Sequence, residues 1–329
     1  MDFELSLGFE NISIKHQKGI VKSRSEVDIS SEVIRGVKLQ IPLIASCMST
    51  VTNANFCNLL SANGSLGIMH RAWTNNEQYV EECKKLTGEW KAAAIGVSGN
   101  DLELADMLVR VGINILVVDV AHGYSDHVIQ FGKQLKKEYP DVKLVLGNTN
   151  NIGLLLETKS FVDGIRVGIS NGSICETKNV AGCSEKQFSV VYKFRKISKE
   201  YGVPILSDGS VKESADFVKA MTCANGVIAG RIFAMCPESA AEIYQYQYND
   251  FFDAPKKIYA GMASRYVQEK WFGKVKNDTP EGKIEYLEIG ENVDKLLRRY
   301  AGALRSGISY AGGKDIKTFQ EDVEFVRLA

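Results

Sequence analysis

Eight short apolar runs, each long enough for one buried β-strand, recur through residues 41–231 of this sequence. Near-continuous hydrophobicity is typical of parallel strands that are buried on both faces. Most of the runs precede a polar stretch with helical character, such as NNEQYVEECKKL or YSDHVIQFGKQLKKEY. The pattern predicts an α/β fold, the (β/α)8 TIM barrel. The runs are IPLIAS (41–46), LGIMHR (66–71), AAAIGVS (92–98), ILVVDVA (115–121), KLVLGN (143–148), GIRVGI (164–169), PILSDG (204–209) and GVIAGR (226–231).

An open, doubly wound sheet is the alternative architecture. It is disfavoured because no GxGxxG pattern follows the first run and because the strand–helix units succeed one another without a break. We expect residues 1–329 to form a single catalytic barrel domain without an inserted regulatory domain. Two stretches are additions to the strand–helix units of a minimal barrel. Residues 168–187 are expected to form an active-site cysteine loop, and residues 259–292, which lack clear helical periodicity, a lid or short flap.

Charge and cysteine content exclude several classes of function. Lys plus Arg and Asp plus Glu both number 40, so no global field attracts nucleic acid or an anionic membrane. No apolar run is long enough to span a membrane, and MDFELSLGFE does not resemble a signal peptide, so a cytoplasmic protein is expected. The seven cysteines are irregularly spaced, which predicts reduced thiols and neither a disulfide framework nor a CxxC zinc site.

Polar residues end most of the apolar runs, where barrel enzymes place their chemistry. The loops after the seventh and eighth strands often bind phosphate, and Gly209-Ser210 and Gly230-Arg231 stand there. Cys175 follows a run of small residues in the loop after the sixth strand. It is either a buried packing residue or a nucleophile beside a bound anion. The polar run ends are Ser46, His70-Arg71, Asp119, Asn148, Asp208 and Gly230-Arg231.

At these positions the chain resembles the family of IMP dehydrogenase and GMP reductase over nearly its whole length. The resemblance implies a TIM barrel, a purine mononucleotide substrate (GMP or IMP) and a nicotinamide cofactor. A short flap and the opening SRSEVD are more similar to GMP reductase, so NADPH-dependent reduction of GMP to IMP and ammonia is expected. The matching stretches are SRSEVD (23–28), MSTVT (48–52), GIMHR (67–71), DVAHGYSD (119–126), GN (147–148), RVGISNGSICET (166–177), SDGS (207–210), GMAS (261–264), EG (281–282) and LRSGISYAGGKDI (304–316).

The resemblance also implies a role for each matching position. Cys175 would attack the purine, and Thr177 and Glu281 would relay a proton. Backbone carbonyls of Ser170, Gly172 and Cys175 would hold potassium, and the assembly would be a homotetramer. The implied substrate-binding residues are Ser46, Met48, Ser173, Asp208, Gly209, Ser210, Gly230, Arg231, Tyr259, Gly261, Met262 and Ala263, and the implied cofactor-binding residues are Ser23, Arg24, Arg71, Asp119, Val120, Ala121, Ser306 and Ser309, some of them across a subunit interface.

The chain departs from the family pattern around the nucleotide site. Ser170 and Ser210 stand where the family has glycine, and Ser49 where it has aspartate. Arg231 replaces a small residue, and we expect it to bind the phosphate rather than pair with an acid such as Glu238. These changes leave two enzymatic alternatives open, an IMP dehydrogenase without regulatory domains and an enzyme for another purine nucleotide. A non-catalytic nucleotide-binding relative is the alternative from another class.

Overall fold

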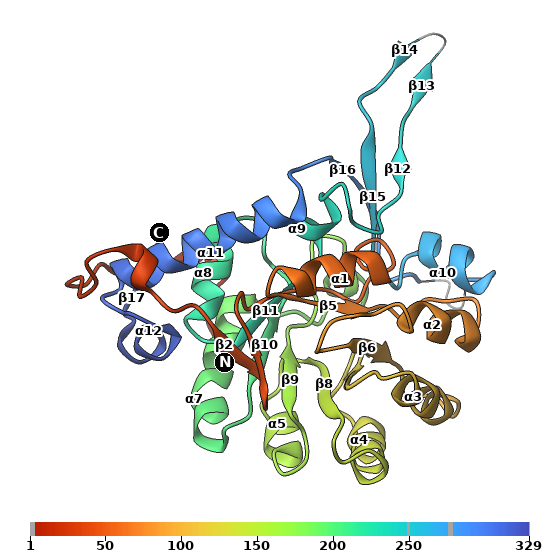
Figure 1. The fold of residues 1–329 in the computed structure, drawn as a ribbon, viewed down its shortest axis with the longest axis horizontal. Coiled ribbons are helices and arrows are strands. Elements are labelled where there is room, and N and C mark those ends of the chain that lie inside the picture. Colours follow the sequence, from red (N-terminus) through yellow and green to blue (C-terminus); the bar gives the residue numbers. More distant parts are fainter. Residues whose placement is uncertain (1–3, 249–250, 276–278, 329) are drawn as a thin grey trace.

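The computed structural model describes residues 4–248, 251–275 and 279–328, and a closed barrel of eight parallel strands forms its centre (Figure 1). Each strand is hydrogen-bonded to the next one along the chain, and the pairing of Ile228 with Ile44 closes the ring. The predicted TIM barrel is therefore confirmed. Its strands are β4 (Leu43–Ala45), β5 (Leu66–Met69), β6 (Ala92–Ile95), β7 (Ile115–Val118), β8 (Lys143–Thr149), β9 (Gly164–Val167), β10 (Ile205–Asp208) and β11 (Gly226–Ala229).

The apolar runs form these strands because the barrel hides both of their faces from water. Every residue of β5, β6, β7, β9 and β11 is buried. Removing such side chains from water is worth about 1.5–3 kcal/mol for each large aliphatic residue. All eight predicted runs lie on the barrel strands.

Helices pack around the outside of the barrel, and three of them begin at an Asn or Ser side-chain cap. Asn53, Asn75 and Ser125 each accept a hydrogen bond from a backbone N–H in the first turn of the following helix. The helices that follow the strands are α1 (Ala54–Ala62), α2 (Asn76–Cys83), α3 (Asp101–Arg110), α4 (Asp126–Glu138), α5 (Gly153–Thr158), α6 (Thr177–Val180), α7 (Gln187–Tyr201), α8 (Ser214–Met221), α9 (Arg231–Ala234) and α11 (Val293–Tyr310).

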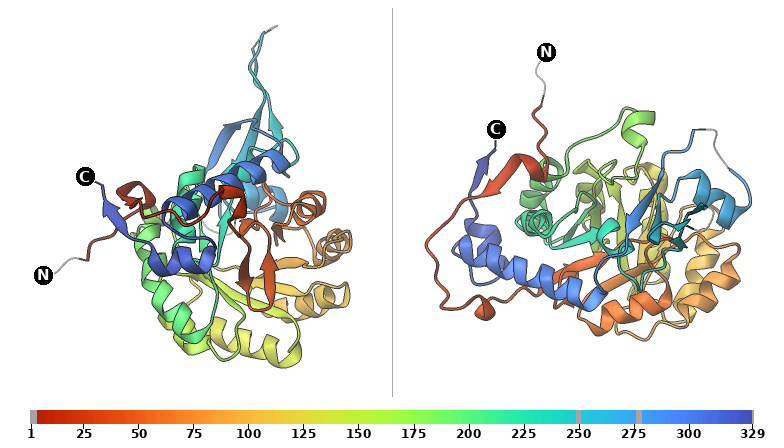
Figure 2. Two further views of the ribbon diagram at one scale, coloured as in Figure 1. Left: turned by 60° about the vertical axis from the view of Figure 1, so that its left-hand side comes forward. Right: turned by 90° about the horizontal axis from the view of Figure 1, so that it is seen from above.

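Segments from the two ends of the chain meet on one side of the barrel. Strand β1 (Ile12–Ile14) pairs antiparallel with β17 (Phe325–Arg327), and Figure 2 shows both ends of the chain on that side. A separate hairpin is formed by β2 (Ser31–Ile34) and β3 (Val37–Leu39). The remaining elements here are the 3-10 helices η1 (Phe9–Asn11) and η2 (Arg24–Glu26) and helix α12 (Ile316–Asp322).

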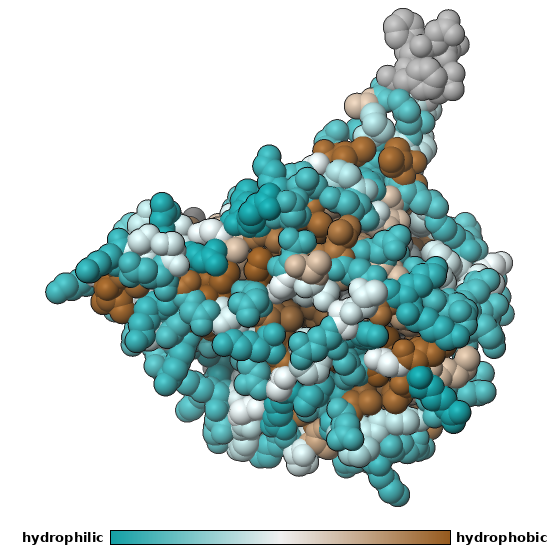
Figure 3. All heavy atoms as spheres, viewed as in Figure 1, coloured by the Kyte–Doolittle hydropathy of each residue, from teal (hydrophilic) through white to brown (hydrophobic). Residues whose placement is uncertain are grey.

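The region between β11 and α11 forms a projecting arm and a flap (Figure 1). Strands β12 (Ile243–Tyr244), β15 (Lys256–Ala260) and β16 (Ile284–Glu288) form one sheet, and β13 (Gln247–Tyr248) pairs with β14 (Phe251–Phe252) at the tip. Figure 3 shows hydrophobic surface where the arm leaves the barrel, and there Ile243 and Tyr286 are more than half exposed.

The flap contains a helix that the sequence did not reveal. Helix α10 (Arg265–Phe272) is capped by Ser264, whose hydroxyl accepts a bond from the Val267 N–H at 3.3 Å, and ends at Gly273 in the left-handed conformation. The helix has only two turns, and only Val267 and Gln268 in it are buried. The sequence therefore shows no apolar repeat with helical spacing. The cysteine loop likewise contains the one-turn helix α6. Among the described residues, no helix is long and apolar enough to cross a membrane.

Candidate active site

A cavity of about 490 Å³ opens at the carboxyl ends of the barrel strands, between the cysteine loop and the flap. Parallel strands bring their carboxyl ends to one face, so residues far apart in sequence converge there. The strand ends contribute Ser46, Cys47, Met48, Arg71, residues 119–121, Asn148, Arg166, Asp208, Gly209 and Gly230, the cysteine loop contributes residues 168–172, Ile174, Cys175 and Thr177, and the flap contributes Tyr259, residues 261–263, Gln268, Phe272 and residues 279–282.

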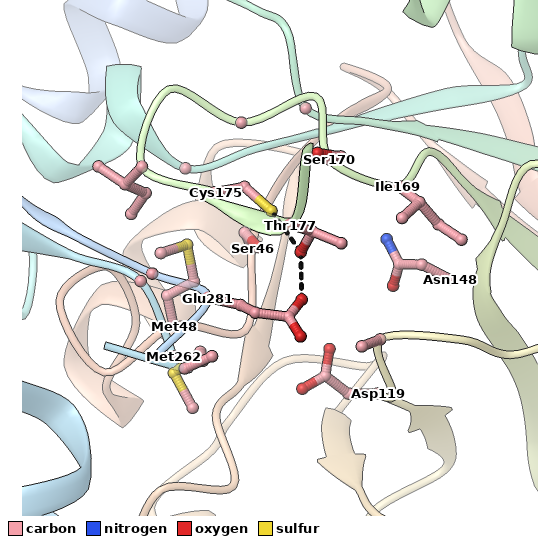
Figure 4. A pocket seen from close by; sticks show the side chains of 18 of the residues that line it. Ser46, Met48, Asp119, Asn148, Ile169, Ser170, Cys175, Thr177, Met262 and Glu281 are labelled. Atoms are coloured by element: carbon pink, nitrogen blue, oxygen red, sulfur yellow. Dashed lines mark hydrogen bonds between the residues drawn. The ribbon is translucent and has the colours of Figure 1, made fainter. Parts of the chain in front are cut away.

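Cys175, Thr177 and Glu281 form one hydrogen-bonded chain beside this cavity (Figure 4). The Thr177 hydroxyl donates to Glu281 Oε2 at 2.7 Å, and the Cys175 Sγ lies 3.3 Å from the Thr177 Oγ1. Because the single hydroxyl proton of Thr177 is used toward Glu281, the thiol is the donor toward Thr177. The chain can therefore carry a proton from the thiol to the carboxylate.

Backbone pairing between the cysteine loop and the flap holds this chain together. The Glu176 N–H donates to the Glu281 carbonyl at 2.8 Å, and the Lys283 N–H donates to the Ile174 carbonyl at 3.0 Å. Within the flap, Gly282 lies so close to the segment before α10 that an added Cβ would sit 2.9 Å from the Ser264 backbone nitrogen. A side chain at position 282 would push these two flap segments apart.

A buried arginine joins two carboxylates at the base of the cavity. Arg166 is 5% exposed, and its Nη1 and Nε lie 2.7 Å from Asp119 Oδ1 and Asp208 Oδ2. Burial alone would raise the pKa of Asp119, but the charge of Arg166, with help from Arg71, lowers it below the usual value. Asn148 also donates to Asp208 Oδ2, at 2.6 Å. The network holds Asp119 as a charged acceptor and directs the Asp208 carboxyl group through two donors.

The residues expected to hold a phosphate are only partly brought together. Gly209 and Gly230 line the cavity, whereas Ser173, Ser210 and Arg231 are not among its lining residues. Arg231 forms an ion pair with Glu285 of β16 rather than with Glu238, the acid suggested from the sequence. The Glu238 carboxylate instead accepts the backbone N–H of Val293.

Two serines occupy backbone conformations that favour glycine. Ser170 and Ser210 have φ angles of +67° and +61°, and they are the non-glycine residues with positive φ in the described ranges. The Ser210 hydroxyl donates to the Asn171 carbonyl at 3.0 Å. The buried Ser170 hydroxyl, which lines the cavity, and the buried Ser49 hydroxyl have no hydrogen-bond partner within the described structure.

The expected cofactor-binding residues fall into two groups. Arg71 and residues 119–121 line the cavity, and the Arg71 Nε lies 3.3 Å from Asp119 Oδ2. A second group lies outside that lining, where Arg24 Nη1 donates to the Ser306 hydroxyl at 2.8 Å. Ser23 precedes Arg24 as the cap of η2, and Ser309 lies one turn beyond Ser306 on α11. The structure thus joins segments almost 300 residues apart, as one surface separate from the cavity.

Exposure separates Cys175 from most of the other thiols. Cys175 is half-buried and Cys183 is exposed, while Cys47, Cys57, Cys83, Cys223 and Cys236 are buried. Burial raises the pKa of Cys47 to about 12 even though Arg166 lies beside it. The described residues contain no group of three or more His, Cys, Asp or Glu side chains arranged to hold a metal ion.

Sequence reasoning missed some residues at the cavity. Arg166 carried a usable signal, because a charged residue inside the apolar run GIRVGI must find buried partners. Gln268, Phe272 and Thr279 carried none, since they reach the cavity only through the way in which the flap folds. Arg265 and Tyr266, at the start of α10, are outside the lining, and Tyr266 donates to Glu242 at 2.7 Å.

Comparison with known proteins identifies a family and several relatives. The sequence model of the IMP dehydrogenase / GMP reductase domain matches residues 6–329. The chain is 33% identical over 269 residues to the inosine-5'-monophosphate dehydrogenase of Nitrosopumilus maritimus, covering 78% of this chain and 56% of that protein. It is 32% identical to the enzyme of that name from Aquifex aeolicus (77% and 52% covered) and 26% identical to that of Borreliella burgdorferi (98% and 94% covered).

These relatives correct one expectation from the sequence. An NADPH-dependent GMP reductase was expected, but the similar curated proteins are named inosine-5'-monophosphate dehydrogenases, so that assignment is wrong. The short flap and the opening SRSEVD therefore did not discriminate between the two activities of the family. The chain spans about half the length of the first curated relatives that it matches.

Proposed function

Because the chain belongs to the IMP dehydrogenase / GMP reductase family, we propose that it oxidises a purine 5′-mononucleotide with a nicotinamide cofactor, as the names of its dehydrogenase relatives suggest. The observation that carries this proposal is the Cys175–Thr177–Glu281 chain beside the cavity. A protein that only bound nucleotides would not need a thiol linked to a carboxylate through a hydroxyl.

The geometry suits covalent catalysis by Cys175. Its proton passes through the Thr177 hydroxyl to Glu281, and the thiolate forms a C–S bond with C2 of the purine, a carbon that two ring nitrogens make electrophilic. A nicotinamide cofactor, when bound, accepts the hydride that leaves this carbon. Glu281 releases the first proton to solvent, then takes a proton from water as the water oxygen bonds to C2 and the C–S bond breaks. That proton returns through Thr177 to the thiolate.

Substrate binding is assigned to the strand ends on the other side of the cavity. Asp208, oriented by its ion pair with Arg166, would accept hydrogen bonds from the ribose hydroxyls. Met48 and Met262 supply polarisable apolar surface for the flat base (Figure 4). Further substrate contacts are assigned to Ser46, Gly209, Gly230, Tyr259, Gly261 and Ala263.

The residues present fit a nicotinamide cofactor at the end of β7. Val120 and Ala121 offer small apolar surface, and the Arg71–Asp119 pair offers donors and an acceptor for an amide group. The separate surface at Ser23, Arg24, Ser306 and Ser309 would receive the adenosine end of a cofactor bound by another subunit, as in the expected homotetramer. Potassium at the carbonyls of Ser170, Gly172 and Cys175 stays a prediction.

The direct test compares two reactions in the same assay. Inosine 5′-monophosphate with NAD⁺ should raise absorbance at the wavelength where reduced nicotinamide absorbs, and Cys175→Ala should abolish the change while the nucleotide still binds. GMP with NADPH is the comparison pair and should give no decrease. Binding without turnover in the wild type would support a nucleotide-binding protein and overturn the enzymatic proposal.

A further inference from the structure

In α/β barrels, the loops after the seventh and eighth strands commonly bind a phosphate group. In this chain, those loops follow β10 and β11 and contain Ser210 and Arg231. The structure places a carboxylate from outside the barrel beside Arg231. That carboxylate belongs to Glu285 of β16, which pairs with Tyr259 of β15 in the sheet of β12, β15 and β16.

Glu285 engages the two strongest side-chain donors of the expected phosphate site. Its Oε2 accepts a hydrogen bond from the Ser173 hydroxyl at 3.1 Å and forms the ion pair with Arg231. An arginine and a hydroxyl that converge on one oxygen of an anion are also suited to a phosphate oxygen. About three quarters of the Glu285 side chain is buried, so the contact is held within the folded protein.

A second cation, Lys283, lies near the other carboxylate oxygen of Glu285. The Lys283 Nζ lies 3.9 Å from Glu285 Oε1 and 3.6 Å from Glu176 Oε1. If Glu285 left Arg231, Lys283 could therefore receive it without a large movement of the strand. The carboxylate thus has two alternative cationic partners.

We propose that Glu285 is a specificity-determining residue that occupies the place of the ligand's phosphate in the free protein, and that a nucleotide 5′-phosphate binds by displacing it from Arg231 and Ser173 toward Lys283. This inference rests on the proposed function. Two anions cannot share one arginine without mutual repulsion, so nucleotides must bind against this competition. A nucleoside, which lacks the phosphate, meets no such barrier.

Displacement of Glu285 would also affect the loop that carries the reactive thiol of Cys175. Ser173 lies two residues before Cys175, and the flap segment that carries Glu285 also carries Glu281, the proton acceptor for Thr177. Displacing Glu285 therefore releases the Ser173–Glu285 contact between flap and cysteine loop and keeps the Thr177–Glu281 contact. Phosphate binding would in this way be linked to the position of the loop that holds Cys175.

Isothermal titration of the wild type and the Glu285→Gln variant with inosine 5′-monophosphate and with inosine tests this inference. Replacing the charge should tighten nucleotide binding by about tenfold, because the neutral amide competes poorly for Arg231, and should leave inosine binding unchanged. The matched control is Glu288→Gln, which removes the same charge from the same strand where Glu288 pairs with the exposed Lys256. It should change neither affinity.

A second pair of variants separates displacement from simple repulsion. Lys283→Gln should weaken nucleotide binding by about threefold in the wild type, and this loss should vanish in the Glu285→Gln background, where no carboxylate needs a new partner. Equal nucleotide affinity in the wild type and Glu285→Gln, or a parallel change for inosine, would overturn the role of Glu285. Binding of neither ligand by any variant would overturn the proposed function, and with it this inference.

Discussion

The replacement of Arg166 by Met tests whether the charge network beneath the cavity was assigned correctly. Arg166 is nearly fully buried and is the shared partner of Asp119 and Asp208, at 2.7 Å from each. Met has a similar length, so the change removes the charge and its hydrogen bonds with little loss of packed volume. Asp119 then keeps only Arg71 as a charged partner, Asp208 keeps the Asn148 amide, and the charge between the two carboxylates is lost.

The expected cost at neutral pH is about 3–5 kcal/mol of unfolding free energy, the range for breaking a buried ion pair from one side. It should depend on pH. In the wild type, the folded pKa of Asp119 is lowered below its unfolded value of 3.8, so its contribution is present above that value and is lost as pH falls. In the variant, burial without Arg166 raises the folded pKa of Asp119, so the penalty grows as pH rises. The gap between the two proteins should narrow in acid.

Urea unfolding followed by circular dichroism, at about pH 7 and about pH 3, measures both quantities. Arg110→Met is the matched control, since Arg110 forms an exposed ion pair with Asp106 on α3 and its loss should cost less than about 1 kcal/mol. If Arg166→Met cost no more than the control, or cost the same at both pH values, the network would not hold charged carboxylates as described.

Three further outcomes follow from single side chains. Burial lowers the pKa of His70 to about 3, so at about pH 5 this imidazole is neutral in the folded protein and protonated in the unfolded chain. The free energy of unfolding of the wild type should therefore fall by about 2 kcal/mol between neutral pH and about pH 5. Urea titrations of His70→Gln should lack that slope. Ser170→Gly should raise stability by about 1 kcal/mol in thermal melts, because it relieves a positive φ and an unpartnered hydroxyl. Ser210→Gly should not, since it also loses a hydrogen bond. Thr177→Val should slow turnover about 10²-fold in initial-rate assays, with unchanged nucleotide affinity by titration, because the path from thiol to Glu281 is cut.

The barrel could be predicted from the sequence because its strands are short, apolar throughout and separated by polar helices. The same rule placed Ser46, Asp119, Asn148 and Asp208 together, since parallel strands deliver their ends to one face. The arm and helix α10 could not be predicted. Their strands span two to five residues and the helix two turns, so neither has a pattern long enough to rise above chance.

The partner of Ser173 and Arg231 could not be predicted from the barrel loops alone. The positions of Ser173 and Arg231 followed from the strand order, but their partner did not. Glu285 lies 54 residues after Arg231, on β16, and its position depends on the register in which β16 pairs with β15. Nothing local in the sequence indicates which flap residue faces the barrel.

Covalent trapping of the thiol tests the central claim, that Cys175 is the nucleophile which attacks the purine. A 2-halopurine 5′-mononucleotide should react by loss of halide and leave one stable thioether, located by peptide mass spectrometry. The account predicts labelling at the half-buried Cys175, protection by excess inosine 5′-monophosphate, and none at Cys183, although Cys183 is the more exposed thiol of the same loop. Labelling at Cys183, or at Cys175 without protection by the nucleotide, would contradict it.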